Sequence, residues 1–539
     1  MDKYLRAHWS LDRAPLVECC VFESTKSSQF FRIDLSSNGV ELSPESPCDG
    51  NAPRQLVRPK SRKRHTTELL TWREILGAAI TTHNNQRCDL IEFTIYGCIP
   101  KKKNHRNRRN IHAAASTEST SASFSSIGVT ATPKPAKRES IDRLLVQWSF
   151  RCRGERNVKV VPLLVEHIQH LADPRALTET ASCPLPRRRY LVYINPVGGA
   201  GKASQTFKTV VEPVFHRSRI DYDVITTQYQ AHATEHAQQL PLSVYDCVVC
   251  IGGDGLLAEV LQGIMKRRDW KQAIRQPLGI IPGGSGNGLS AALLAGSDEA
   301  PHALNAAYAL AKGTVHDLDI ATVLNSHQEV MYSFLSLTWA FIAHVDIESE
   351  RFRMFGGHRF TISAVARILG SQQTFSGTIR YLCSDDDKHA PPKYHERTHG
   401  FEDEVAPALD CYPSPLRNNE PHVNGEWKEL SGRFHFFWGM NVSHGASDAH
   451  VAPGAAIDDG YYYLVCAPAP FSKFELTKLL LGLDHGTHVN QANVHLIRTR
   501  AFTLHVDNPT DLVVVDGEVF RGPHLQVEVH RALARIMCL

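Results

Sequence analysis

The chain has 539 residues, of which 42% are apolar and 21% charged, and its formal net charge is +3. This length predicts several domains, and the composition is that of an ordinary globular protein. The nearly balanced charge argues against a protein that binds nucleic acid over its whole surface, so we expect no nucleic-acid partner.

Cysteine usage and hydropathy indicate the cellular environment of the protein. The 13 cysteines include no Cys-x-x-Cys pair, so the sequence predicts neither a zinc site nor a disulfide framework and fits a reducing compartment. The N-terminus lacks the apolar core of a signal peptide. The longest apolar stretches, such as Phe334 to Val345, are shorter than the ~20 residues that a membrane helix needs. We therefore expect a cytoplasmic protein that does not span a membrane.

Residues 1–175 are predicted to form an N-terminal β-rich module. Residues 90–99 and 144–152 resemble strands, and residues 160–171 have the apolar spacing of a helix. Between the two strands lie a basic tract and a stretch rich in Ser, Thr, Ala and Pro, which cannot bury a core. We expect a disordered insert there, over about 101–140.

Residues 187–318 alternate strand, glycine-rich loop and helix. Apolar runs at 190–194, 244–251 and 278–281 have the pattern of buried parallel strands, and 256–264 has helical spacing. Strands that alternate with helices predict a doubly wound parallel sheet, in which the loops at the carboxyl ends of the strands bind the ligand.

Residues 319–539 change to short alternating runs with frequent turns, which is typical of a β-sandwich-like domain. Two helical stretches, 360–369 and 471–483, carry apolar stripes that fit either core packing or the lining of a channel for an acyl chain. A polar insertion predicts a flexible segment over about 384–429. The C-terminal end of this domain is a candidate to pack back on the domain before it.

Three glycine-rich signatures follow the predicted strands of residues 187–318. They are Asn195-Pro196-Val197-Gly198-Gly199-Ala200-Gly201-Lys202, Gly252-Gly253-Asp254-Gly255 and Pro282-Gly283-Gly284-Ser285-Gly286-Asn287-Gly288. A strand that leads through a glycine turn into a helix aims backbone N–H groups and the positive end of the helix dipole at one point. Glycine permits the positive φ of such turns and lets phosphate approach the backbone. The loops therefore predict a nucleoside triphosphate site.

Asp254 is the unexpected residue among these glycines, because its carboxylate repels phosphate. It can accept a proton from an attacking hydroxyl or help to place Mg²⁺, or it can cap a helix. The two other loops favour the proton acceptor. Glu259, one turn further along, can orient a ribose or a metal-bound water, or it can stabilise the first turn of its helix. The residue directly after Lys202 is Ala203 rather than Ser or Thr, so a P-loop NTPase is disfavoured.

Three further groups of residues give weaker signals. The acids and arginines of residues 341–360 can bind a cationic head group and phosphate, or they form a charged strand edge. Residues 516–518 have the pattern of an ordinary hairpin turn. His232 and His236 are spaced to bind zinc together, but no further ligand is evident, which favours a surface pair. The metal ligands stay unassigned.

The three signatures, together with Asp458-Asp459-Gly460, resemble those of the diacylglycerol-kinase-type lipid kinases. Within that family, the stretch Asp346-Ile347-Glu348-Ser349-Glu350-Arg351-Phe352-Arg353 is similar to the signature of the sphingosine (long-chain base) kinases. The resemblance covers about residue 187 to the C-terminus, apart from the polar insertion. It implies an α/β fold, with a doubly wound nucleotide-binding kinase domain over 187–318 and a β-sandwich-like lipid-binding domain over 319–539. Some relatives carry a pleckstrin-like domain before the kinase, which is the candidate for the N-terminal module.

The resemblance implies an ATP-dependent kinase, with Mg²⁺ as cofactor, that phosphorylates the primary hydroxyl of sphingosine or a related long-chain base to give the 1-phosphate. Asp254 would be the catalytic base, and Asp346 the acid that recognises the amino-alcohol head, with Gly252, Gly253 and Gly255 beside the substrate. The residues implied around ATP are Asn195, Pro196, Val197, Thr227, Glu259, Gly284, Ser285, Gly286, Arg353, Arg359, Asp516, Gly517 and Glu518. Because such a substrate resides in bilayers, the membrane surface is the expected partner.

Three positions depart from the family pattern. His344 stands where the family usually has a further Asp, so contacts to the head group differ there. Gly252 replaces a common Ser and Ala231 replaces a polar residue near the nucleotide, which changes local hydrogen bonding.

Other functions stay open at this point. A ceramide or diacylglycerol kinase would share the fold, and NAD kinases also use a Gly-Gly-Asp-Gly turn, although they would not need the acidic and arginine-rich stretch. A non-catalytic membrane lipid sensor of another class would keep the fold as well. The intact Asp254 and the intact glycine loops argue against the sensor.

Overall fold

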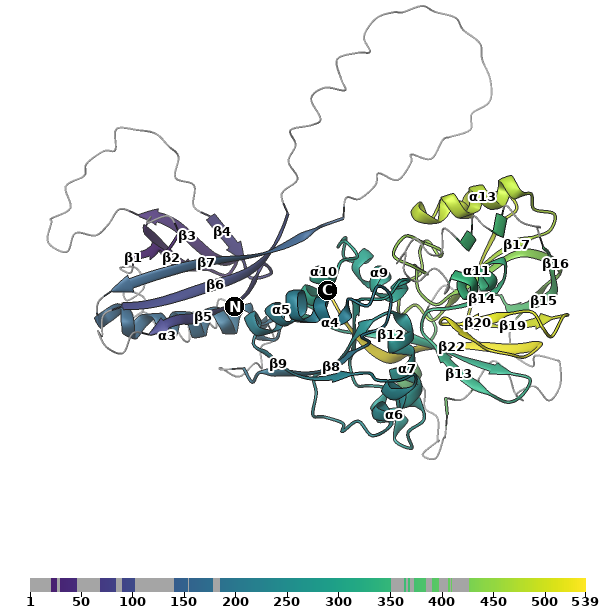
Figure 1. Cartoon of the computed structure of the whole chain (residues 1–539), viewed down its shortest axis with the longest axis horizontal. Coiled ribbons are helices and arrows are strands. Elements are labelled where there is room, and N and C mark those ends of the chain that lie inside the picture. Colours follow the sequence, from purple (N-terminus) through teal and green to yellow (C-terminus); the bar gives the residue numbers. More distant parts are fainter. Residues whose placement is uncertain are drawn as a thin grey trace, which may run out of the picture.

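The structure is a computed structural model with three parts arranged along its long axis (Figure 1). The residues that it describes are 21–26, 30–45, 68–83, 90–101, 140–153, 155–177, 185–349, 363–364, 367–368, 373–383, 390–396, 406–407, 409 and 426–539. Most of the two predicted inserts, over 101–140 and 384–429, lies outside these ranges. Within them, no helix has both the length and the apolar content to cross a bilayer.

The N-terminal module is a seven-stranded antiparallel sheet in the order β4-β3-β2-β1-β7-β6-β5. A helix packs on it, and the core between them contains Ile33, Phe93, Phe150, Val161 and Ile168. The elements are β1 (Val21–Ser24), β2 (Phe30–Leu35), β3 (Gly39–Glu45), β4 (Glu68–Thr71), β5 (Ile75–His83), β6 (Leu90–Pro100), β7 (Arg143–Arg153), α3 (Glu155–Ala172) and η2 (Pro174–Leu177).

The middle part is built on a parallel sheet in which β8 lies between β9 and β10, and β11 follows β10. The strands are β8 (Arg188–Ile194), β9 (Ile220–Thr226), β10 (Cys247–Gly252) and β11 (Leu278–Pro282). Chain order and spatial order diverge between β8 and β10, and ligands of doubly wound folds bind at such switch points. β10 begins three residues later than its apolar run, because Val244 lies in an exposed turn.

Helices cover both faces of this sheet, as the sequence pattern predicts. One core contains residues of α7 and the other contains residues of α10 and α5. The helical elements are α4 (Ala203–Thr206), η3 (Phe207–Val211), α5 (Glu212–Arg217), α6 (His232–Gln238), α7 (Asp254–Met265), α8 (Trp270–Ala273), α9 (Gly288–Ala295) and α10 (Ala303–Lys312).

The third part is a β-rich domain, which confirms the predicted fold class together with the doubly wound sheet. Its strands are β12 (Thr314–Asn325), β13 (Val330–Ser333), β14 (Ser336–Ala340), β15 (Phe375–Leu382), β16 (Trp427–Met440), β17 (Tyr462–Pro468), β18 (His495–Thr499), β19 (Ala501–Val506), β20 (Val513–Val515), β21 (Glu518–Val519) and β22 (His524–Cys538). Its helices are α11 (Phe341–Ser349), η5 (Tyr394–Glu396), α13 (Lys473–Gly482), η6 (Leu483–His485) and η7 (Thr487–Asn490).

The structure of this domain tests two interpretations made from the sequence. The hairpin predicted around 516–518 is confirmed, because β20 pairs antiparallel with β21. The charged strand edge is wrong for 341–349, which form helix α11 directly after β14. The apolar residues at the start of that helix pack into the same core as α13. The burial of these residues, rather than the exposure of the acidic ones, therefore accounts for the helix.

Two long strands run through both of the larger domains. The last residues of β22 pair with β12 and, at Ile536, with Leu278 of β11, while its earlier residues belong to the sandwich. The pairing of β12 with β22 shifts register at Asp319, whose buried carboxylate accepts hydrogen bonds from the N–H groups of Ala532 and Gly460 at 2.7 and 2.5 Å. One continuous sheet therefore fixes the β-rich domain relative to the doubly wound domain.

Candidate functional site

The three glycine signatures meet at the carboxyl edge of the parallel sheet. Gly199 has φ +57°, and a Cβ there would lie 2.8 Å from the carbonyl oxygen of Gly283. A Cβ on Gly284 would lie 2.3 Å from the Cα of Gly253. Such distances are too short for any side chain, so the loops can touch backbone to backbone only because these positions are glycine.

Asn195 organises the first loop. Its Oδ1 accepts hydrogen bonds from the N–H groups of Val197 and Gly198, both at 3.1 Å, and its own N–H donates to the carbonyl of Ile251 in β10. Thr227, at the end of β9, donates to the carbonyl of Ile194, the residue before Asn195. The structure thus brings Asn195, Thr227 and the second loop to one edge.

Asn287 shapes the third loop, and sequence reasoning assigned it no role. Its side chain both accepts from and donates to the backbone of Gly284, at 2.9 Å in each case, and its φ is +56°. The dipeptide Asn-Gly was the available signal, because both residues favour left-handed turns. In the same loop Ser285 is buried.

Asp254 occupies the first position of α7 and is 8% exposed. Its carboxylate accepts hydrogen bonds from the N–H groups of Gly288, at 2.8 Å, and Leu289, at 3.1 Å, at the start of α9. It therefore binds the N-terminus of a helix other than its own. Burial raises the pKa of this carboxyl, and the hydrogen bonds from Gly288 and Leu289 oppose that rise. Because a carboxylate offers about four acceptor positions, it can still receive a proton.

Glu259 lies on the same helix, beside the N-terminus of α6. Backbone N–H groups of Ala231 and Ala233 stabilise its carboxylate, but burial dominates and the pKa of Glu259 is raised, to which the nearby Glu518 contributes. Its Oε2 is buried, and no hydrogen-bond donor among the described residues reaches it. Glu259 and Glu518, which lie far apart in the sequence, thus share one region.

The β-rich domain contacts the third loop. The N–H of Ser447 donates to the carbonyl of Gly286 at 3.0 Å, and Asn287 forms an isolated bridge with Ala446. A Cβ on Gly288 would lie 2.8 Å from the carbonyl oxygen of Gly445. The site is therefore bordered by both larger domains.

The hairpin at 516–518 divides into a buried and an exposed part. Asp516 accepts hydrogen bonds from the Ser333 hydroxyl and from the N–H groups of residues 334–336, at 2.7 to 3.1 Å. Burial raises the pKa of Asp516 to about 6. Its side chain fixes the loop before β14, while Gly517 and Glu518 are exposed.

Asp346 lies on α11, which continues β14, the neighbour of β20 in the sheet. Its side chain is partly exposed. On the same helix His344 packs on the ring of Phe375, and burial lowers the pKa of His344. The predicted nucleotide residues Arg353 and Arg359 lie outside the described residues.

His232 and His236 each lie beside a polar group of another residue. The Nδ1 of His236 lies 2.7 Å from the hydroxyl of Tyr193, and the Nδ1 of His232 accepts from the N–H of Gln228. Among the residues that the structure describes, no group of three or more His, Cys, Asp or Glu side chains could hold a metal ion.

Comparison with known proteins gives this arrangement a family. Residues 189–323 match the diacylglycerol kinase catalytic domain, and residues 422–538 match the YegS C-terminal NAD kinase beta sandwich-like domain. The fold and the three loops thus define a diacylglycerol-kinase-type lipid kinase.

Two individual relatives indicate the group within this family to which the chain belongs. Sphingosine kinase 1 of Arabidopsis thaliana is 33% identical over 379 residues, which cover 68% of this chain and 76% of that protein. Sphingosine kinase 1 of Homo sapiens is 31% identical over 359 residues, or 64% of this chain and 90% of that protein. The chain belongs to the sphingosine kinases within the diacylglycerol-kinase-type family.

Proposed function

We propose that this protein is an ATP-dependent lipid kinase that transfers the γ-phosphoryl group of ATP to the primary hydroxyl of sphingosine or a related long-chain base. The products are ADP and the 1-phosphate of the base. The observation that carries the proposal is the carboxylate of Asp254, held by backbone amides where three glycine loops touch. The relatives named above, which act on sphingosine by their names, support the substrate class.

Asp254 is the catalytic base in this proposal. It accepts the proton of the substrate hydroxyl as the hydroxyl oxygen bonds to the γ-phosphorus and the bond to the ADP oxygen breaks. Its carboxyl group has a raised pKa, so it is a stronger proton acceptor than an exposed aspartate. Positioning and electrostatics supply most of the rate in phosphoryl transfer, and the amides at Gly288 and Leu289 fix the position of the base.

The glycine loops would bind the ATP phosphates through their amides, with Asn195, Pro196, Val197, Thr227, Gly284, Ser285 and Gly286 around the nucleotide. The acidic side chains of Glu259 and Glu518 lie near each other in this region. Mg²⁺ usually reaches such sites on the phosphates with one or two carboxylates, and the Oε2 of Glu259, buried and without a donor among the described residues, fits that need. When bound, the ion would neutralise charge on the transferred group.

Asp346 would recognise the amine of the substrate head group. The amine of a long-chain base is cationic near neutral pH, and an anionic side chain beside it disfavours neutral lipids such as diacylglycerol and ceramide. Gly252, Gly253 and Gly255 would border the reacting hydroxyl. His344, on the same helix, keeps its ring against Phe375, so it would contribute shape rather than a second charge.

We infer further that the enzyme works at a membrane surface, with α13 as one point of contact. Phe474 and Leu481 are 77% and 76% exposed. They are seven residues apart, which places them on one side of the helix. Exposed lysines accompany them at Lys473 and Lys478. Apolar side chains flanked by lysines suit the boundary of an anionic bilayer.

The test is a phosphorylation assay with radiolabelled ATP against sphingosine, dihydrosphingosine, phytosphingosine, ceramide, diacylglycerol and NAD. The proposal predicts a labelled product from the long-chain bases and little from the other acceptors. Labelling of ceramide or diacylglycerol instead would assign the neutral-lipid alternative, and labelling of NAD alone would assign another kinase class. A chain that binds lipid and labels nothing would be a sensor.

A further inference from the structure

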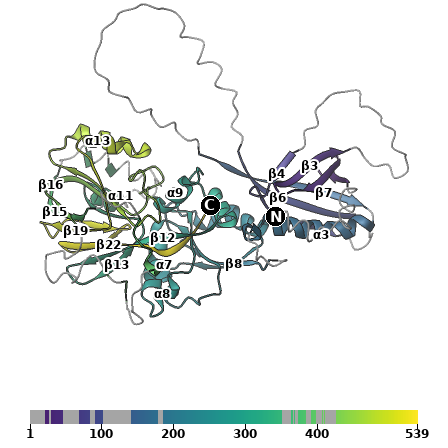
Figure 2. The same ribbon diagram turned by 180° about the vertical axis from the view of Figure 1, so that it is seen from behind.

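The N-terminal module lies directly against the doubly wound domain, as both views of the molecule show (Figures 1 and 2). Residues 141–143, at the start of β7, contact the segment 298–300, which links α9 to α10. Residues 73–75, at the start of β5, contact α10 itself. This contact does not belong to the site described above.

A buried ion pair lies at the centre of the contact. Arg143, at the start of β7, is 8% exposed in its side chain, and Glu299 of the kinase domain is 2% exposed. The Arg143 Nη2 donates to Glu299 Oε1 at 2.6 Å, and its Nε lies 3.0 and 2.9 Å from the two carboxylate oxygens. The guanidinium also donates to the carbonyl of Cys98 and lies 3.7 Å from the centre of the Tyr308 ring. Fork-shaped pairing of this kind fixes geometry as well as charge.

Backbone hydrogen bonds surround the pair. The N–H of Ile141 donates to the carbonyl of Asp298 at 2.7 Å, and the N–H of Ala300 donates to the carbonyl of Ile141 at 2.8 Å. Asn305 Nδ2 bridges Glu299 Oε2 and the carbonyl of Ile141. The segment 298–300 is thus joined to the module by main chain and side chains together, which a loosely tethered domain would not require.

Close packing continues along α10 and α5. The Tyr308 hydroxyl donates to the carbonyl of Arg73, and Lys312 Nζ donates to the carbonyls of Ile75 and Ala172. A Cβ on Gly77 would lie 2.3 Å from the carbonyl oxygen of Arg217. The approach of β5 to the end of α5 therefore depends on glycine.

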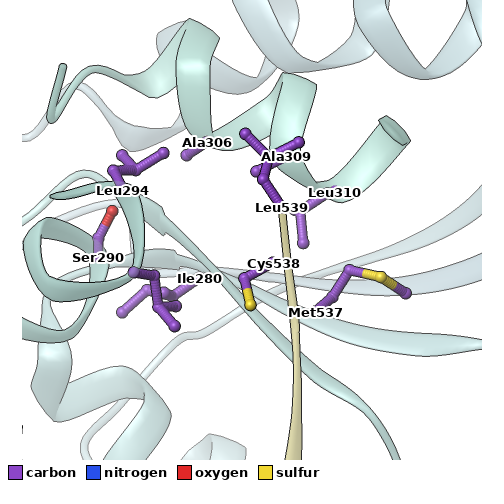
Figure 3. Close-up of a pocket in the computed structure, with 10 residues that line it drawn as sticks. Ile280, Ser290, Leu294, Ala306, Ala309, Leu310, Met537, Cys538 and Leu539 are labelled. Carbon is purple, nitrogen blue, oxygen red and sulfur yellow. The ribbon is translucent and has the colours of Figure 1, made fainter. Parts of the chain in front are cut away.

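The anchored segment follows α9, the helix whose first amides hold the proposed catalytic aspartate. Helix α9 receives the Asp254 carboxylate at Gly288 and Leu289, and near its other end Leu294 accepts a hydrogen bond from the N–H of Glu299 at 2.9 Å. Figure 3 shows that α9 meets α10 and the C-terminal residues around a small cavity, which residues such as Ser290 and Leu294 line.

The cavity measures about 10 Å³, room for one water at most, and the buried Ser290 hydroxyl beside it has no hydrogen-bond partner among the described residues. The ion pair at Glu299 supplies a fixed point at the end of the helix that lies away from Asp254.

We propose that the N-terminal module is a fixed lobe of the kinase, and that Arg143 is a positioning residue that acts through Glu299. By anchoring the end of α9, it keeps the amides of Gly288 and Leu289 where they hold Asp254. This inference rests on the proposed function for its kinetic consequence, and the docking itself stands apart from it.

The experiment compares full-length variants by steady-state kinetics and by hydrogen–deuterium exchange. Arg143→Met leaves the buried Glu299 carboxylate without its cationic partner, which is strongly destabilising at such a contact. We expect kcat for the long-chain base to fall at least tenfold while KM for ATP and for the base stays within twofold, and amide exchange in 288–295 to accelerate. Arg143→Met combined with Glu299→Met, which replaces the pair by apolar groups, is expected to restore most of both readouts.

The control is Arg151→Met, on the same strand, where the partner is Glu23 of the module itself and the arginine is partly exposed. It should leave kcat and exchange in α9 unchanged. If the methionine variant does not fold, Arg143→Lys keeps the charge but not the fork and should show smaller changes in the same direction.

Unchanged kcat with unchanged exchange in 288–295, in a folded Arg143 variant, would overturn the inference. A fall in kcat without faster exchange there would overturn it too, because the effect would then not pass through α9. If the wild-type chain phosphorylates no long-chain base, the proposed function fails, and the exchange data alone still decide whether Arg143 anchors α9.

Discussion

The carboxylate of Asp254 accepts a 2.8 Å hydrogen bond from the N–H of Gly288, and this bond ties the second glycine loop to the helix that follows the third. The position of the proposed base therefore depends on the positions of the proposed phosphate-binding loops. A change that forces these loops apart should disturb the position of the base as well as nucleotide binding.

A pair of glycine substitutions tests whether the close contact between the loops is needed. Gly284→Ala places a Cβ 2.3 Å from the Cα of Gly253, so the loops must separate, and we expect loss of ATP binding and a lower melting temperature. Gly255→Ala is the matched control, because Gly255 lies in the first turn of α7 and a Cβ there would meet none of the described residues within 4 Å. Differential scanning fluorimetry with and without ATP measures both effects. Equal behaviour of the two variants would contradict the packing argument.

Much of this arrangement could be predicted from the sequence. The order of strand, glycine loop and helix gives the doubly wound sheet, because glycine spacing and apolar runs are local signals. The contact between Asp254 and α9 could not be predicted, since it joins residues that are 34 apart through the pairing of β10 with β11. Helix α11 was missed as well, because its charged residues obscured an apolar face that only tertiary packing reveals.

The ion pair between Arg143 and Glu299 illustrates the same limit. The two residues are 156 positions apart and neither belongs to a motif. A buried charge pair between domains leaves no periodic trace in the sequence, so only the docked structure reveals it.

Removing the proposed head-group acid should change selectivity more than chemistry. For Asp346→Asn we expect KM for sphingosine to rise about 10- to 100-fold, the equivalent of one charge-assisted contact, with kcat nearly unchanged. Activity on ceramide should stay low or rise, because the variant no longer favours a cation. Kinetics with both lipids in mixed micelles measure this. A large loss of kcat at saturating sphingosine would contradict the assigned role.

The docked N-terminal module should give the protein a distinct pH dependence. Burial and the nearby Arg188 lower the pKa of Lys312, which meets the carbonyls of Ile75 and Ala172, to about 7 from the usual 10.5. Below pH 7 the lysine is protonated in both the folded and the unfolded chain, so the folded protein bears the full cost of burying its charge. Between about pH 7 and 10.5 the unfolded chain holds more protons, so the free energy of unfolding rises with pH through this window.

Lys312→Met should remove that part of the slope in chemical denaturation measured from pH 6.5 to 10. The exposed lysine at position 208 provides the control, since Lys208→Met should leave the slope as it is. An identical slope in wild type and Lys312→Met would contradict the assignment.

Membrane contact through α13 predicts a defect that depends on how the substrate is presented. Phe474→Gln with Leu481→Gln should weaken sedimentation with anionic vesicles and lower activity on sphingosine in those vesicles. Activity on sphingosine in detergent micelles should persist, because the side chains are exposed and away from the core. Val330→Gln, at an exposed position on β13, is the control. Vesicle binding that is equal in all three proteins would argue against α13 as the contact.

The central claim is that Asp254 removes the proton from the hydroxyl of a long-chain base, and Asp254→Asn tests it most directly. Asparagine keeps the size of the side chain and one acceptor oxygen for the amides of α9, so the fold and ATP binding should persist. In an assay with radiolabelled ATP and sphingosine we expect kcat to fall by about 10²- to 10⁴-fold, the usual contribution of a positioned base. A folded Asp254→Asn protein that forms sphingosine 1-phosphate at the wild-type rate would contradict the account.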